Sequence, residues 1–368
     1  MLSNSATPLY VHWQEQMGFS SGLLTVIFAL YIAGLLGTLL VAGQLSDYYG
    51  RKPVLLPGLL AALIACGLFA TATSIGMLAA GRLLAGVAVG VIVSAGMAAV
   101  LDAGGTEHKR RAALLASVAM VLGAGLGPLL AGWLAQALTQ PVMPIFAIEA
   151  LVLLTALVVA MRLPARRAPA AGPLRLRLPH VPVSNRGQVL CGIATFGPGI
   201  TATSFVLALG PSLLARLLDV RSPLLAGGMA CAMFFAAVGV QFAVRQWPVT
   251  RIFLTSTAAT VLAMASLTLA IHAALVPALI VSALLAGAGQ GLGQLGGLTL
   301  IGLHVPDTHR AQSNAVLNIG GYIPAGLLPV ATGYLIDAVG LATGATLFAV
   351  VLAIVALVGG AWAVRRLA

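Results

Sequence analysis

Residues 43–55 read GQLSDYYGRKPVL, a short charged turn that joins two long apolar runs, Gly22 to Gln44 and Val54 to Thr73. Each run has about 20 residues, the length that an α-helix needs to cross the hydrocarbon core of a bilayer. Within the turn, Gly50 permits a backbone conformation that other residues rarely adopt, and Asp47 can pair with a basic side chain or a helix N-terminus. We therefore predict a tight turn between two membrane-spanning helices.

The rest of the chain has the same apolar character. Of its 368 residues, 60% are apolar and 7% are charged, whereas soluble proteins carry about 25% charged residues. Nine further apolar runs are long enough to span a membrane: Ile75 to Leu101, Ala112 to Leu138, Val142 to Met161, Val189 to Leu209, Leu224 to Val244, Ile252 to Ile271, Ala273 to Ile301, Ala311 to Leu335 and Leu341 to Ala363. The sequence thus predicts an all-α protein in the lipid bilayer, with eleven full spans.

The first residues of the chain are apolar but too few to cross a membrane. Leu2 to Trp13 is a short run that contains Pro8, and it has the length of half a span. We expect Met1 to fall inside a truncated first span, with a reading frame that extends upstream by about 10 to 30 residues. The intact design would then have twelve spans, with both termini in the cytosol.

Basic residues are distributed unevenly between the loops. Sixteen of the 19 Lys and Arg residues lie in alternate loops or at the C-terminal end, and two lie in the loops between them. Basic loops stay on the cytosolic side of a membrane. A nucleic-acid-binding protein would instead gather its basic residues on one exposed face with interleaved aromatic residues. The net charge of +11 therefore indicates membrane topology, and we expect no nucleic-acid partner.

One basic segment divides the spans into two sets. Arg162 to Arg186 contains six Arg, five Pro and no acidic residue, a composition that disfavours a packed unit. We expect a cytoplasmic linker at 162–187 between an N-terminal helical bundle at 1–161 and a C-terminal helical bundle at 188–368. The halves repeat each other weakly, since Gly43 and Gly239 are 196 residues apart, as are Pro128 and Pro324.

The turn at residues 43–55 resembles the G-x-L-x-D-x-x-G-R-K signature of the major facilitator superfamily, and the span number, linker and polarity extend this resemblance over the whole chain. The resemblance implies a major facilitator fold of two six-helix bundles. It also implies a gating motif in which the Asp and the first Arg pair with neighbouring helices when the cytosolic side is closed. The matching residues here are Gly43, Asp47, Gly50, Arg51 and Lys52, and we expect Gly43 to let neighbouring helices approach.

Two charged residues inside spans are candidates for proton coupling, because a charge in the bilayer core is costly and usually functional. Arg82, followed by Gly86 and Gly90, resembles the fourth-helix motif of proton-coupled family members, although Ala85 replaces the expected Gln. The alternative is that Arg82 extends to the outer interface. Glu149 lies deep in the run Val142 to Met161, the sixth span when the truncated first span is counted. In the family this helix is usually peripheral, so a structural role is the alternative for Glu149.

The run Ala112 to Leu138, the fifth span when the truncated first span is counted, contains GAGLGPLLAG at residues 123–132. This stretch is similar to the G-x-x-x-G-P-x-x-G-G motif of exporters in this superfamily, with Ala131 in place of one Gly. Glycines spaced by four residues let helix backbones touch, and a proline bends a helix. We expect a hinge or antiporter motif, with simple helix packing as the alternative. Its residues are Gly123, Gly127, Pro128 and Gly132.

Uncharged polar residues mark a candidate substrate cavity. Gln290 and Gln294 are four residues apart and therefore share a helix face, as do Asn318 and Tyr322. Asn4, Thr7 and Thr201 are expected to face the same cavity, and hydrogen bonding between helices is the alternative for each residue. Such a cavity suits a small apolar or weakly charged solute.

The sequence shows none of the residue patterns of an enzyme or of a phosphate-binding loop. We therefore expect a non-enzymatic secondary transporter in the cell membrane, a monomer with no cofactor and with the proton gradient as its energy source. Alternating access would drive proton-coupled efflux of a small solute. Proton-coupled uptake of a sugar or another metabolite is one alternative, and a non-transporting membrane receptor or scaffold is another.

Overall fold

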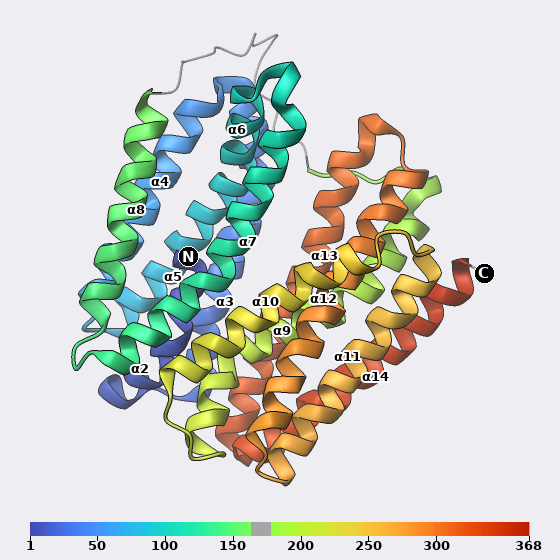
Figure 1. Ribbon diagram of the computed structural model, residues 1–368. Helices are drawn as coiled ribbons and strands as arrows, with labels where there is room; N and C mark the ends of the chain where they lie inside the picture. Colours follow the sequence, from blue (N-terminus) through green and yellow to red (C-terminus); the bar gives the residue numbers. More distant parts are fainter. Residues whose placement is uncertain (163–177, 368) are drawn as a thin grey trace.

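The computed structural model describes residues 1–162 and 178–367, apart from the side chains of residues 105–107, 109, 110, 113 and 114, and it is almost entirely helical (Figure 1). Eleven of the described helices are long and apolar enough to cross a membrane. This confirms the predicted number of spans and the all-α membrane fold. The prediction that a twelfth span begins upstream of Met1 stays a prediction.

The spans of the N-terminal bundle are α3 (Ser21–Tyr49), α4 (Arg51–Ala70), α5 (Ile75–Val91), α7 (Gly105–Ala137) and α8 (Val142–Arg162). Helix α5 continues through a π-helical turn (Ile92–Gly96) into α6 (Met97–Ala103). Three short elements precede α3, namely α1 (Leu2–Ser5), the 3-10 turn η1 (Thr7–Leu9) and α2 (Tyr10–Met17).

The C-terminal bundle begins with the 3-10 turn η3 (Val183–Asn185), and its spans are α9 (Arg186–Arg216), α10 (Pro223–Ala243), α11 (Val249–His272), α12 (Val276–His304), α13 (Asp307–Val339) and α14 (Leu341–Leu367). Figure 1 shows the helices of the two bundles as separate groups, blue to green and yellow to red. All eleven predicted runs coincide with these helices, and most helices extend past the apolar runs because polar residues continue their end turns.

The predicted linker lies largely outside the described residues, which omit 163–177. Its last described part packs more closely than its composition suggests. The side chain of Asn185 is buried and donates a hydrogen bond to the carbonyl oxygen of His304 at 3.0 Å. The backbone N–H of His180 donates to the side chain of Gln312 at 3.1 Å. This part of the chain is therefore attached to the C-terminal bundle.

The turn between α3 and α4 has the geometry that the sequence predicts. Gly50 lies between the two helices with a φ of +94°, a conformation that is strained for any residue with a Cβ atom. Helix α3 can therefore end and α4 begin within a single residue.

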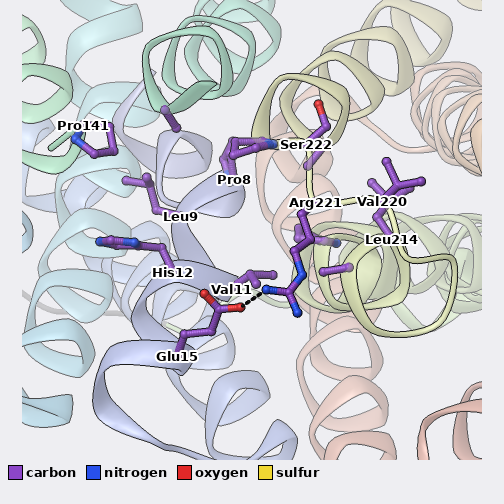
Figure 2. A pocket seen from close by; sticks show the side chains of 15 residues that line it. Pro8, Leu9, Val11, His12, Glu15, Pro141, Leu214, Val220, Arg221 and Ser222 are labelled. Atoms are coloured by element: carbon purple, nitrogen blue, oxygen red, sulfur yellow. Dashed lines mark ion pairs between the residues drawn. The ribbon is translucent and has the colours of Figure 1, made fainter. Parts of the chain in front are cut away.

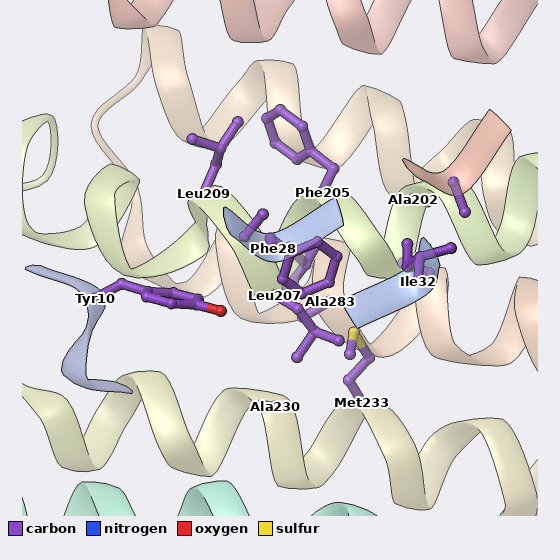
Figure 3. Packing of buried hydrophobic residues seen from close by; sticks show 14 of the residues in the cluster. Tyr10, Phe28, Ile32, Ala202, Phe205, Leu207, Leu209, Ala230, Met233 and Ala283 are labelled. Carbon is purple, nitrogen blue, oxygen red and sulfur yellow. The ribbon is translucent and has the colours of Figure 1, made fainter. Parts of the chain in front are cut away.

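The buried core joins both bundles. Trp13 of α2 stacks on Phe69 of α4 and Phe146 of α8, with ring centroids 6.0 and 6.3 Å apart, and this attaches the short N-terminal elements to the bundle. Helix α9 is the most buried span, at 83% of its apolar window. Figure 3 shows α3 residues Phe28 and Ile32 in one cluster with side chains of α9 and α10.

The most extensive contacts between the bundles are those of α3 with α13 and of α7 with α10, and α9 also contacts α2 and α3. A Cβ atom added at Gly132 of α7 or at Gly227 of α10 would overlap backbone atoms of the other helix. These contacts begin at the ends of the helices that lie farthest from Arg162, the last residue of α8, and extend to about the middle of the bundles. Toward the end where α8 terminates, the bundles diverge (Figure 1). By the positive-inside assignment, the end at which the bundles diverge is the cytosolic side, and the end at which they touch is the outer side.

Candidate functional site

Arg82 of α5 lies in the interior of the protein and does not extend to the outer interface. Its side chain has no exposed surface, and its Nη1 donates to the carbonyl oxygen of Ser3 at 2.6 Å. The guanidinium carbon lies 4.9, 5.1 and 5.8 Å from the ring centroids of Tyr31, Phe28 and Tyr10. Nε and Nη2 have no partner among the described residues. A buried guanidinium thus lies among three aromatic rings, with the N–H groups of two of its nitrogens unused.

Close helix packing explains why the rings lie over Arg82. A Cβ atom added at Gly86 of α5 would overlap the carbonyl oxygen of Tyr31, and one added at Gly34 of α3 would overlap that of Leu83. Only glycine at both positions lets α3 and α5 approach this closely. The predicted motif residue Gly86 therefore has a packing role, which brings Tyr31 of α3 against Arg82.

Glu149 of α8 is buried, and its side chain points into the bundle although α8 is a peripheral helix. Its Oε1 accepts a hydrogen bond from the hydroxyl of Ser5, while Oε2 has no partner among the described residues. Glu149 and Arg82 therefore both contact the short helix α1, one through Ser5 and the other through Ser3. The sequence did not reveal this link, because Ser3 and Ser5 carry no recognisable signal.

The predicted cavity residues fall into two groups. Gln290, Gln294, Asn318 and Tyr322 are partly exposed on α12 and α13, which agrees with a polar lining. Asn4, Thr7 and Thr201 are buried in this conformation. Asn4 donates to the carbonyl oxygen of Ala124 at 3.4 Å. Thr201 donates to the carbonyl oxygen of Gly197 in its own helix at 2.7 Å, which is neither contact with a cavity nor the hydrogen bond between helices that was its alternative.

The glycine motif of α7 makes contacts in two directions. A Cβ atom added at Gly127 would lie 2.7 Å from the Cα atom of Met1, and one at Gly123 would lie 3.3 Å from the nitrogen of Met1. Farther along the helix, a Cβ atom at Gly227 of α10 would overlap the carbonyl oxygen of Pro128. The motif therefore lies where α7 crosses both α1 and the opposite bundle, and Gly227 is a partner that the sequence analysis missed.

The outer closure also includes polar contacts between the bundles. The carboxylate of Asp337 on α13 accepts hydrogen bonds from the backbone N–H groups of Ser21 and Gly22 at 2.9 and 2.8 Å. Sequence analysis had no signal for this contact, because Asp337 looks like an ordinary solvated residue at a span end. Three further polar pairs join the bundles at this end: Ser212 with Gln14 at 3.2 Å, Ser222 with Gln136 at 3.1 Å and Arg221 with Glu15 at 3.5 Å.

A small cavity of about 180 Å³ lies at the same closure. Figure 2 shows its lining, with the ion pair of Glu15 and Arg221 next to Val11 and with Pro8 near Ser222. Residues of both bundles line it, so the outer closure is not completely filled by side chains. Among the residues that the structure describes, no group of three His, Cys, Asp or Glu side chains could hold a metal ion.

The predicted gating motif forms a cluster of charged residues at the cytosolic end of the N-terminal bundle. Arg51 donates to Asp47 at 2.5 Å, to Ser46 at 2.8 Å and to Asp102 at the end of α6 at 3.1 Å. Lys52 donates to the carbonyl oxygen of Met161 at 2.5 Å. All these partners belong to the N-terminal bundle.

The structure contradicts one expectation about this motif. A Cβ atom added at Gly43 would have no neighbour within 4 Å, so Gly43 does not bring helices together in this conformation. The close approach of α3 to its neighbours occurs nearer its middle and its outer end, at Gly34 and Gly22.

Comparison with known proteins agrees with this architecture. The family model of the Major Facilitator Superfamily matches residues 1–248. A tetracycline resistance protein, class H, from Pasteurella multocida is 38% identical over 113 residues, or 30% of this chain and 27% of that protein. Multidrug resistance protein MdtL from Shewanella sp. (strain ANA-3) is 34% identical over 104 residues, or 28% and 26%. The matched segments thus span about a quarter of the length of these curated relatives, 27% and 26%.

Solved structures resemble the chain over nearly its whole length. A POT family transporter in complex with a thioalcohol-conjugated peptide has a TM-score of 0.77 at 14% identity, covering 97% of this chain and 91% of the other. A bacterial homolog of the human lysosomal transporter Spinster, in an inward-facing and unoccupied conformation, has a TM-score of 0.75 at 13% identity, covering 99% and 93%. At these identities the likeness shows the fold alone.

Proposed function

Because the chain belongs to the major facilitator superfamily, we propose that it is a secondary active transporter that exports a small apolar or weakly charged solute by proton-coupled alternating access. The observation that carries the proposal is the asymmetry of the contacts between the bundles. Backbone-close helix crossings and the Asp337 contact close the outer side, while the bundles diverge on the cytosolic side (Figure 1). This arrangement is one of the two states that alternating access requires.

The proton gradient is the proposed energy source. Moving one charge through 100 mV supplies about 2.3 kcal/mol, enough for roughly fiftyfold accumulation. Arg82 and Glu149 are the proposed coupling residues, because both are buried and both contact α1. Helix α1 lies against α7, the helix that crosses to the other bundle. A change in the protonation of Glu149 would therefore alter a contact that leads to the interface between the bundles.

The proposed solute follows from the polar groups of the C-terminal bundle. Gln290, Gln294, Asn318 and Tyr322 offer amides and a hydroxyl without formal charge. The amide Oε1 of Gln290 is buried and has no partner among the described residues, so it is free to accept a hydrogen bond from a bound solute. The relatives named as resistance proteins support export of such a compound, over the limited segments that they match.

Measuring solute accumulation tests the proposal. Cells with and without the protein would be loaded with a panel of apolar and weakly charged solutes that includes tetracycline, before and after an ionophore abolishes the proton gradient. We expect lower accumulation in cells that contain the protein, a loss of this difference with the ionophore, and a loss with Glu149→Gln. Higher accumulation would instead indicate uptake of a metabolite, and no difference for any solute would support the receptor or scaffold alternative.

A further inference from the structure

The N-terminus of α3 is capped by one residue from each bundle. Within its own bundle, the side chain of Ser20 accepts a hydrogen bond from the backbone N–H of Leu23 at 3.2 Å. The two preceding N–H groups, those of Ser21 and Gly22, donate to the two carboxylate oxygens of Asp337 on α13. The first turn of α3 contains no acidic residue of its own. The negative charge that stabilises this helix end therefore comes from the opposite bundle.

Close packing holds the carboxylate in position. A Cβ atom added at Gly22 would lie 2.7 Å from the ring of Tyr334 and 2.8 Å from Oδ2 of Asp337. A Cβ atom added at Gly333 would lie 2.7 Å from the carbonyl oxygen of Ser21. The two helices therefore touch through glycine surfaces. Asp337 lies one turn after Gly333 on the same face of α13, which places it over the free N–H groups of α3.

From this geometry we propose that Asp337 is a positioning residue that holds the outer side of the protein closed. The inference rests on the alternating access of the proposed function, because opening the outer side must separate α3 from α13. Separation leaves the N–H groups of Ser21 and Gly22 without their carboxylate acceptor. The only inter-bundle ion pair among the described residues, Glu15 with Arg221, is exposed and 3.5 Å long, a kind of contact that contributes little. Asp337 is also exposed, but its two oxygens accept from the N–H groups of two buried residues at 2.9 and 2.8 Å. The Asp337 contact thus contributes more than the Glu15–Arg221 pair to the electrostatic stability of the closed state at this end.

The experiment measures the conformation directly. Nitroxide labels would be placed at Thr73, in the turn after α4, and at Ala273, in the turn after α11, both exposed at the outer end. The three buried native cysteines, Cys66, Cys191 and Cys231, would be replaced by Ala in every sample. Distance distributions of the protein in lipid nanodiscs then report the ratio of outer-open to outer-closed molecules.

Two substitutions weaken the contact from opposite sides. Asp337→Asn removes the charge and one acceptor. Ser21→Pro removes the N–H donor at the first helical position, where proline is well tolerated. We expect each to raise the outer-open ratio about threefold to tenfold, the range for losing a charged acceptor at a helix N-terminus. The N–H of Gly22 still faces residue 337 in Ser21→Pro, and one acceptor remains in Asp337→Asn. The double substitution should therefore change the free energy by less than the sum of the two single changes, because both weaken the same contact.

The matched control is Ile75→Pro. Ile75 is the first residue of α5, which also begins at the outer end after a capping serine, Ser74, whose side chain accepts from Met77. This control should leave the distances unchanged. Unchanged distances with Asp337→Asn or with Ser21→Pro, or additive effects in the double variant, would overturn the inference. The distances are measured without a solute, so they do not depend on what the protein exports. If Asp337→Asn shifts the distances although the unchanged protein exports none of the solutes tested, only the efflux proposal is overturned.

Discussion

The two ends of α3 differ in what they contact. At its outer end, Ser21 and Gly22 bond to Asp337 of the opposite bundle. At its cytosolic end, Ser46 and Asp47 bond to Arg51 within the same bundle. Among the contacts of the described residues, this helix thus reaches across the interface at its outer end and bonds within its own bundle at its cytosolic end. This difference shows which side of the protein is closed, and it assigns the closure to residues that carry no family signature.

The contrast also separates two kinds of sequence signal. The charged turn at residues 43–55 identifies the family, yet in this conformation its described partners all lie in the N-terminal bundle. We expect its contacts with the C-terminal bundle to form in the outward-facing state. Variants at the two ends should therefore have opposite effects on the balance between states, and the predictions below test this difference.

The largest effect is expected from Gly227→Ala. The added Cβ atom would overlap the carbonyl oxygen of Pro128, and backbone on both sides leaves no flexible side chain to move. Overpacking of this kind costs about 1–3 kcal/mol. We expect the outer side to stay partly open and transport to fall more than tenfold, measured in proteoliposomes. The neighbouring Gly228→Ala is the control, since its Cβ atom would meet only a side-chain methyl at 3.9 Å. Equal activity of the two variants would contradict the prediction.

The next largest effect is expected from Arg82→Gln. This change removes the charge among the rings of Tyr10, Phe28 and Tyr31 and the short bond to Ser3. Hydrogen bonds to charged groups contribute about 1.5–3 kcal/mol, so transport should fall about tenfold or more and lose its pH dependence. Arg82→Lys should rescue transport only if charge alone matters, because lysine lacks the planar fork of donors. A pH profile that Arg82→Gln leaves unchanged would show that Arg82 is structural.

The fold was predictable from sequence to a greater extent than the site. Spans such as Val142 to Met161 are unbroken apolar runs, and lipid permits few alternatives to a helix. Gly50 was predictable because the turn required a positive φ. Thr201 is buried in this conformation and its hydroxyl bonds within its own helix, and composition does not reveal which face of a buried helix meets water. Asp337 was missed because its partners are backbone groups, which every residue has.

A smaller effect on stability is expected from Asp47→Asn. The ion pair with Arg51 is exposed on the Asp47 side at 71%, and exposed pairs contribute about 0.2–1 kcal/mol. Thermal unfolding should therefore change little, while transport should fall severalfold because the latch is needed when the cytosolic side closes. Asp307→Asn is the control, since Asp307 forms a comparable exposed pair with Arg310 in the other bundle. Undiminished transport at normal expression would remove Asp47 from the gating mechanism.

The smallest effect is expected from Gly43→Ala, and its comparison with Gly50→Ala tests how the motif uses its glycines. Gly43 has open space around its Cβ position, and alanine favours a helix over glycine by about 1 kcal/mol. The inward-facing protein should therefore be unchanged or slightly more stable, as should Gly239→Ala at the matching position of the other half, which is equally open. Gly50→Ala forces a Cβ atom onto a φ of +94° and should cost about 1–3 kcal/mol. Thermal unfolding of the three purified variants measures both effects. If Gly43→Ala lowers transport without lowering stability, then the glycine is needed for close packing in the outward-facing state, and the expected approach of helices at this end occurs there.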